Sequence, residues 1–143
     1  MSYSLSAPNR KTFTDSLHAK GLRPTRQRSC VYGVILDKRD HPTADDIYDR
    51  VRKFLPSTSF ATVYNCLETL VSCGLVRQVN MARSPTRYCP NLTPHAHFKC
   101  TKTGKILDVK IDKDTLSRIQ SLVPDGFVAE NIDLCFSGKG HQN

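Results

Sequence analysis

The spacing of apolar residues predicts helices in the first part of the chain and short strands in the second. In the first part, apolar residues recur three and four positions apart, as they do along one face of an α-helix. The expected helices cover residues 11–20, a stretch from Thr25, a stretch from Thr43 to Pro56, and a stretch from residues 57–59 to Gly74. The last has the most continuous apolar face, made by Val63, Cys66, Leu67, Leu70 and Val71.

Capping residues mark where these helices begin and end. Thr25 and Thr43 are suited to cap the second and third helices, because a threonine hydroxyl accepts a hydrogen bond from the first turn. Asp46, three residues after Thr43, completes a short capping box, and Gly21 suits the end of the first helix. Residues 1–9 are polar and without periodicity, so we expect a mobile arm there.

A pattern typical of β-strands follows the fourth helix. It predicts a hairpin made of residues 75–80 and 86–88, with a turn at residues 82–85. Helices followed by a two-stranded hairpin are the layout of a winged helix-turn-helix. In that layout the fourth helix of this chain would read DNA.

The second part of the chain combines short strands with one helix. Strands are expected at residues 97–100, 105–109 and 127–136, and a helix at residues 113–123. A three-stranded sheet with one helix leaves an open edge that invites a partner chain. We therefore predict an α+β protein made of a winged helix-turn-helix in residues 1–88, a hinge in residues 89–94 and a small α/β dimerisation domain in residues 95–143.

The net charge of +8 lies almost entirely in the first part of the chain. Residues 1–88 carry 14 lysines and arginines against 7 acidic residues, whereas residues 89–143 carry 7 against 6. A basic domain joined to a nearly neutral one indicates nucleic-acid binding. The alternative is a basic surface that serves solubility alone.

Two groups of residues in the basic part are candidates for DNA contacts. Arginines at the start of the second helix oppose its dipole, which indicates that they serve an anion such as a phosphate. On the fourth helix, hydroxyl, phenol and amide groups lie opposite the apolar face and can reach base edges. The DNA-binding residues predicted from these two helix starts are Arg23, Thr25, Arg26, Arg28, Ser59, Thr62, Tyr64 and Asn65.

Composition argues against several other classes of protein. No apolar run is long enough for a membrane span, and the start of the chain lacks the apolar region of a signal peptide. We therefore expect a cytoplasmic protein without a membrane partner. In that compartment the six cysteines are better explained as buried thiols or metal ligands than as disulfides.

A run of potential metal ligands lies where the two parts of the chain meet. His95 and His97 are one residue apart, so on an extended segment both imidazoles point to the same face. Cys89 precedes them and Asp108 follows, which completes a mixed donor set suited to Zn²⁺ or Fe²⁺. His41, expected to be extended because a proline follows it, could join them or lie at the surface. The alternative for the run is a solvated strand beside a small buried cysteine.

Four motifs in this order resemble the ferric uptake regulator family. They are Gly21–Arg28 (GLRPTRQR), His41–Tyr48 (HPTADDIY), Ala61–Asn65 (ATVYN) and Pro94–Phe98 (PHAHF). The likeness is greatest to the peroxide-sensing branch of that family. It implies a dimeric, metal-responsive transcriptional repressor that binds a double-stranded DNA operator and is not an enzyme.

The resemblance also implies roles for individual residues. His41, His95 and His97 match three histidines that bind the regulatory metal, and Asp108 matches an aspartate ligand. In peroxide-sensing members the metal is Fe²⁺ and peroxide oxidises ligand histidines, at positions that His41 and His95 match. One divalent ion per chain is therefore expected, Fe²⁺ or Mn²⁺, with Zn²⁺ as an alternative.

Two departures from the family pattern affect the expected metal sites. Cys89 stands where an acidic ligand is usual, and zinc-sensing relatives have a cysteine near this place; Asn91 or water could act instead. Thr103 replaces the second cysteine of the pair that begins at Cys100, and the C-terminal cysteine pair is missing. We therefore expect no structural zinc bound by four cysteines.

Three other functions are alternatives to this one, and the residues favour them unequally. A zinc-sensing repressor would use Cys89 as a thiolate ligand, and a winged-helix regulator could bind DNA without metal. A metallo-hydrolase would need a general base beside its metal, yet the chain has only Glu68 and Glu130 and no His-Glu-x-x-His motif.

Overall fold

The computed structural model describes residues 4–140 and divides the chain into two compact units. The first unit ends at Leu92 and the second begins at Thr93. This boundary falls within the hinge expected at residues 89–94.

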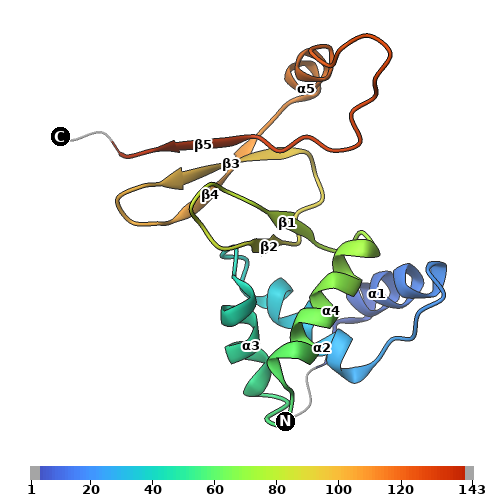
Figure 1. Ribbon diagram of the computed structural model, residues 1–143. Coiled ribbons are helices and arrows are strands. Elements are labelled where there is room, and N and C mark those ends of the chain that lie inside the picture. The colour runs from blue at the N-terminus through green and yellow to red at the C-terminus, as the bar shows by residue number, and fades with distance from the viewer. Residues whose placement is uncertain (1–3, 141–143) are drawn as a thin grey trace. The chain divides into compact units, whose positions relative to one another are not determined.

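The first unit holds four helices followed by an antiparallel hairpin (Figure 1). Its elements are α1 (Ala7–Ala19), α2 (Arg26–Asp37), α3 (Ala44–Arg52), α4 (Phe60–Ser72), β1 (Arg77–Val79) and β2 (Arg87–Cys89). The order confirms the predicted winged helix-turn-helix. Its core is one apolar cluster to which every helix contributes, including the fully buried Leu17, Ile35, Ile47 and Leu67.

The caps expected from the sequence are present. The Thr25 hydroxyl accepts a hydrogen bond from the Arg28 amide at 3.2 Å. Thr43 and Asp46 form a complete capping box, in which each side chain accepts from the other's backbone amide. Ser59 caps α4 by accepting from the Thr62 amide. These bonds satisfy donors that a helix start would otherwise leave without partners.

The first helix begins earlier than predicted. It starts at Ala7, with Ser6 as its N-cap and Pro8 in its first turn. Leu5 is buried, and the helix buries Phe13 and Leu17. The mobile arm is therefore wrong for residues 7–9, because a cap and a proline at the helix start outweigh the missing apolar periodicity. Residues 1–3 of the expected arm lie outside the described residues.

The second unit contains a three-stranded sheet and one helix (Figure 1). Its elements are β3 (His95–Cys100), β4 (Ile106–Lys110), α5 (Lys113–Gln120) and β5 (Cys135–Gly138). The strand order is β4-β3-β5, with β4 antiparallel and β5 parallel to the central strand β3. A helical unit with a small hairpin, followed by a mixed sheet with one helix, confirms the α+β class.

Two boundaries in the second unit differ from the prediction. A strand over residues 127–134 is wrong: β5 begins only at Cys135 and pairs with four residues of β3, from His97 to Cys100. Phe127 and Val128 are 73% and 90% exposed in the single chain. Helix α5 ends at Gln120 rather than residue 123.

Strand register separates the two faces of this sheet. Asp108 pairs with His97, so both side chains share a face with His95. The opposite face is apolar: Phe98 pairs with both Leu107 and Phe136. Leu107 and Phe136 are about half exposed in the single chain, which leaves apolar surface for a partner to cover.

Among the described residues, no helix combines the length and the apolar character that a membrane crossing requires.

Candidate metal ligands and nucleic-acid surface

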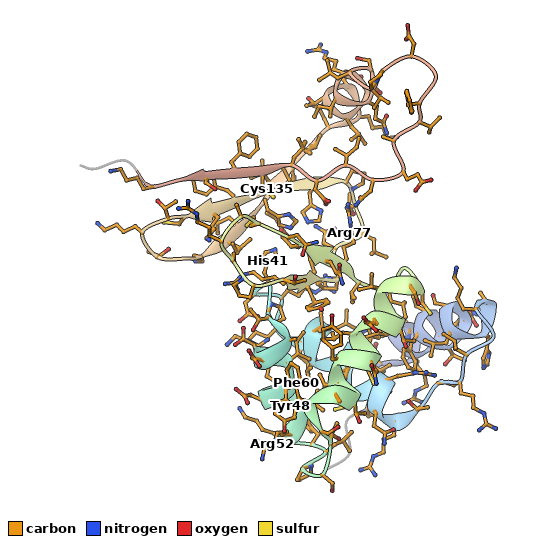
Figure 2. All side chains as sticks on the ribbon, viewed as in Figure 1. His41, Tyr48, Arg52, Phe60, Arg77 and Cys135 are labelled. Atoms are coloured by element: carbon orange, nitrogen blue, oxygen red, sulfur yellow. The ribbon has the colours of Figure 1, made fainter. Side chains whose placement is uncertain are left out.

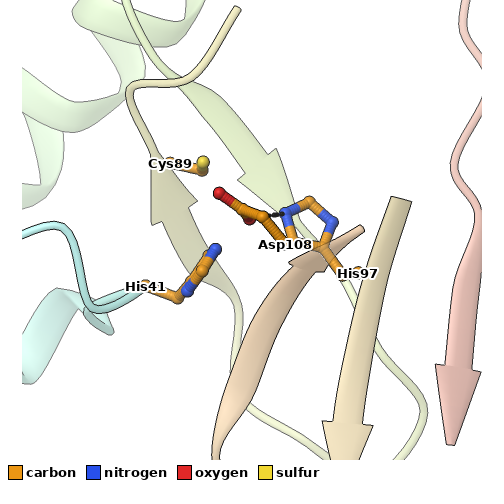
Figure 3. Close-up of side chains that lie close together, drawn as sticks. All are labelled: His41, Cys89, His97 and Asp108. Atoms are coloured by element: carbon orange, nitrogen blue, oxygen red, sulfur yellow. Dashed lines mark ion pairs between the residues drawn. The ribbon is translucent and has the colours of Figure 1, made fainter. Parts of the chain in front are cut away.

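Three of the predicted ligands converge in the second unit. The His95 Nε2 and His97 Nε2 atoms are 3.0 Å apart. Asp108 Oδ1 lies 3.5 Å from the first and 3.4 Å from the second, as Figure 3 shows for His97 and Asp108. Two imidazole nitrogens and a carboxylate oxygen at this spacing form a donor set typical of late first-row divalent ions.

A hydrogen bond orients the first of these histidines. His95 Nδ1 lies 2.6 Å from the backbone carbonyl oxygen of Thr93. A carbonyl can only accept, so Nδ1 carries the proton and the neutral ring has its lone pair on Nε2. This arrangement, in which the second ring nitrogen donates to a carbonyl, is usual for metal-bound histidines. His95 is also 92% buried, which fixes the ring further.

The first unit brings together the other two predicted ligands. His41 and Cys89 are both buried, and their ligand atoms lie within 4.8 Å of each other (Figure 3). Cys89 ends strand β2, and His41 lies in the short loop before α3. A neutral imidazole and a thiol, kept from water, can supply two ligands once the thiol loses its proton.

His41 does not have the extended backbone expected before a proline. Its φ is +56°, in the left-handed region that few residues other than glycine adopt. Strand β2 holds this conformation: Arg87 Nη1 donates to the His41 carbonyl at 3.0 Å. The Tyr88 amide donates to the Pro42 carbonyl at 2.9 Å, and Thr43 pairs with Arg87 as an isolated bridge. Tertiary contacts therefore override the local preference.

The predicted DNA-binding residues gather where α2 and α4 begin. Arg26, Ser59 and Thr62 line one hollow of about 420 Å³. Thr25, Arg28, Thr62 and Asn65 line a second, of about 220 Å³. Basic side chains beside two helix N-termini are suited to phosphate oxygens.

Arg23 and Tyr64 lie outside these two hollows. Arg28 Nη1 donates to the Arg23 carbonyl at 2.7 Å, which connects the segment before α2 to the first turn of that helix. Tyr64 and Asn65 are exposed on α4, as the predicted reading face requires.

Sequence reasoning missed three residues on this surface and one beside the metal ligands. Phe60, Tyr48 and Arg52 form an aromatic and cationic group at the α3–α4 edge, in which Phe60 and Arg52 are exposed and Tyr48 is partly buried. The sequence could have indicated Phe60, because it is an apolar residue that falls outside the apolar stripe of α4. No pattern in the sequence indicated Arg87, because its hydrogen bond to His41 joins residues that are 46 positions apart.

The residues around Cys100 bear on the expected lack of a structural zinc. Cys100 pairs with Gly138 across the β3–β5 register, and all six cysteines are reduced. Hydrogen bonds, first from the Thr103 side chain and then from the Thr103 and Lys102 backbone, hold the pKa of Cys100 below its usual value. A threonine here serves the thiol as a hydrogen-bond partner.

Comparison with known proteins settles the family. The model of the ferric uptake regulator family matches residues 19–137. The chain belongs to the ferric uptake regulator family. Members of this family are transcriptional regulators rather than enzymes, so the metallo-hydrolase alternative is excluded.

Two of the similar proteins are named for their response to peroxide, and the chain spans less than two thirds of the length of the first. It is 37% identical, over 93 residues, to the peroxide-responsive repressor PerR of Staphylococcus epidermidis; the match covers 65% of this chain and 62% of that protein. The crystal structure of the Campylobacter jejuni peroxide stress regulator matches with a TM-score of 0.68 and 28% identity, over 96% of this chain and 98% of that one.

A second solved structure supports the fold. The ferric uptake regulator of Pseudomonas aeruginosa, determined with manganese, matches with a TM-score of 0.72 over 91% of this chain and 98% of that one. At 24% identity this likeness bears on the fold alone.

Proposed function

We propose that this protein is a metal-dependent, DNA-binding repressor that responds to peroxide. The observation that carries the proposal is the convergence of His95, His97 and Asp108 in a family of transcriptional regulators. The similarity to two peroxide-responsive proteins supports the choice of signal. We place the protein in the cytoplasm, where its operator would be.

One divalent ion per chain is bound, in this proposal, by His41, Cys89, His95, His97 and Asp108. The donors fit such an ion: three imidazoles, a carboxylate and a thiolate provide nitrogen, oxygen and sulfur ligands for Fe²⁺, Mn²⁺ or Zn²⁺. His41 and Cys89 come from the first unit, and His95, His97 and Asp108 from the second.

Ligands from both units would couple metal binding to DNA binding. A bound ion restricts how the units can move relative to each other, and so raises the population of DNA-competent conformations. The increase in DNA affinity cannot exceed the ratio of the ion's affinity for DNA-competent conformations to its affinity for the other conformations. A homodimer would present two α4 helices to successive major grooves, as paired reading helices do.

The peroxide response is assigned to His41 and His95. If Fe²⁺ were held by these ligands, it would supply the electrons for the reduction of peroxide, and these two imidazoles are the proposed sites of oxidation. Loss of either ligand would free the units and release the DNA. His95 is suited to this role because the hydrogen bond from Nδ1 to Thr93 orients the ring so that Nε2 faces the other ligands.

A zinc-sensing repressor is the second candidate. The observation that favours it is Cys89, which is buried and lies with His41, where a thiolate would favour Zn²⁺ over Mn²⁺. In that case metal concentration, rather than peroxide, would be the signal.

DNA binding under defined metal conditions tests the proposal. An operator is first selected from random duplexes with the Mn²⁺ form, and its anisotropy is then followed with Fe²⁺, Mn²⁺, Zn²⁺ or chelator. We expect tight binding with metal, loss with chelator, and release by peroxide from the Fe²⁺ form only. Equal binding with and without chelator would make the chain a metal-independent regulator. Binding with Zn²⁺ alone, insensitive to peroxide, would favour the zinc sensor.

A further inference from the structure

Phe60 is a large apolar side chain at the first position of the proposed reading helix. It follows the N-cap Ser59 and is 40% exposed. Tyr64, one turn later on α4, is 43% exposed on the same side. Two exposed aromatic rings beside Asn65 give this part of α4 an apolar surface within a polar face.

Neighbouring rings hold Phe60 in this exposed position (Figure 2). Its ring meets Tyr48 of α3 edge to face, with centroids 5.5 Å apart and planes at 83°. It also stacks on Tyr64, with centroids 6.5 Å apart and planes at 25°. Edge-to-face and offset stacked pairs are favourable arrangements for aromatic rings. The ring is therefore oriented before any partner binds.

A cation completes this group of residues. The Arg52 guanidinium carbon lies 5.3 Å from the centroid of the Tyr48 ring. A guanidinium stacked on an aromatic face stays charged and can still bind a phosphate with its outer edge. The unit that carries the group is strongly basic. An anionic partner that also offers apolar contacts fits this combination.

Duplex DNA is such a partner. In its major groove the C5-methyl of thymine is the apolar feature of the base-pair edges, and phenylalanine is among the side chains that contact it. The phosphates that line the groove match the charge of Arg52. A contact of this kind adds sequence preference, whereas a phosphate contact alone does not.

We propose that Phe60 is a specificity-determining residue that packs on a thymine methyl group, with Tyr48 and Tyr64 orienting its ring and Arg52 binding a nearby phosphate. The proposal rests on the proposed DNA-binding function and adds to it a residue and the base that this residue selects.

Replacing single thymines by uracil tests the contact without changing any base pairing. Uracil lacks only the methyl group, so a scan of the selected operator isolates that group. For the parent protein with Mn²⁺, we expect at least one position where uracil weakens binding about fourfold. This is the loss of affinity expected when one methyl-sized group is no longer buried in the complex. Phe60→Ala should bind thymine and uracil equally at that position, while Phe60→Leu should keep part of the preference.

Matched variants separate this effect from general damage. Phe127→Ala removes an equally apolar, exposed ring from the other unit and should keep the whole uracil profile. Arg52→Ala should weaken binding to all duplexes without changing the profile.

Three outcomes would overturn the inference. The first is an unchanged uracil profile in Phe60→Ala, which is also the outcome if Phe60 serves a protein partner. The second is a parent profile without any methyl-dependent position, in a protein that binds the operator normally; the proposed function would then stand. The third is a parent that binds no DNA with any metal, which overturns the proposed function and this inference together.

Discussion

Arg87 holds His41 in a backbone conformation that the residue would not adopt alone. The guanidinium donates to the His41 carbonyl at 3.0 Å, and the φ of His41 is +56°. Left-handed backbone at a residue other than glycine costs on the order of 1–3 kcal/mol. The contact therefore links the hairpin of the winged helix to a proposed metal ligand.

Arg87→Met should weaken metal binding although Arg87 is not itself a ligand. Without the guanidinium, the His41 loop can relax to an ordinary backbone, and the imidazole then leaves its place beside Cys89. Loss of such supporting contacts typically reduces metal affinity about 10- to 100-fold. Competition against a chromophoric chelator measures the change.

Two variants separate the effect of charge from that of the donor geometry. Arg83→Met removes an exposed arginine from the same hairpin region and should leave metal affinity unchanged. Arg87→Lys keeps the charge but not the forked donor geometry, so it should resemble Arg87→Met. Metal affinity in Arg87→Met equal to that of the parent would remove the positioning role.

Cys89 decides between the two candidate signals. If its thiolate is a ligand, Cys89→Asp should shift the preference from Zn²⁺ toward Mn²⁺ and Fe²⁺, and Cys89→Ser should weaken binding of all three ions. The Co²⁺-substituted parent should show a thiolate charge-transfer band near the ultraviolet edge. A band of the same intensity in Cys89→Ser would exclude ligation and remove the main support for a zinc sensor.

Arg23→Ala should weaken binding to every duplex by a similar factor. A contact to the DNA backbone carries no sequence information. Its loss reduces the slope of log binding constant against log salt concentration by about one. Tyr64→Ala should instead cost about 1–3 kcal/mol and broaden the set of bound sequences. Lys102→Ala, which removes a charge from the second unit, is the control. Operator affinity unchanged in both Arg23→Ala and Tyr64→Ala would refute the assigned surface.

Cys100 should react as an ordinary accessible thiol rather than as a zinc ligand. Hydrogen bonds from Thr103 hold its pKa below the usual value, whereas burial raises the pKa of Cys30 to about 11. Because the thiolate is the reactive form, iodoacetamide at neutral pH should label Cys100 well before Cys30. Thr103→Val should slow that labelling. Protection of Cys100 that ends only when a chelator is added, with one retained zinc per chain, would show a structural zinc after all.

The sequence predicts those features that depend on residues close together in the chain. The capping box of Thr43 and Asp46 and the i, i+2 pairing of His95 and His97 follow from local geometry, and both are present. The start of β5 at Cys135 depends instead on where the chain comes alongside β3, at His97. The left-handed His41 depends on Arg87, which is 46 residues away. Such features need the folded chain, because local preferences point elsewhere.

The central claim is that metal and DNA bind to one coupled system, and reciprocity tests it most directly. If a bound ion raises operator affinity by some factor, operator DNA must raise metal affinity by the same factor. Mn²⁺ affinity is therefore measured by competition with a chelator, with and without saturating operator, alongside DNA affinity with and without Mn²⁺. For the parent, we predict that operator DNA raises Mn²⁺ affinity by the same factor, well above one, by which Mn²⁺ raises DNA affinity. For His97→Ala, we predict a factor near one. Mn²⁺ affinity that is the same with and without operator DNA would contradict the account.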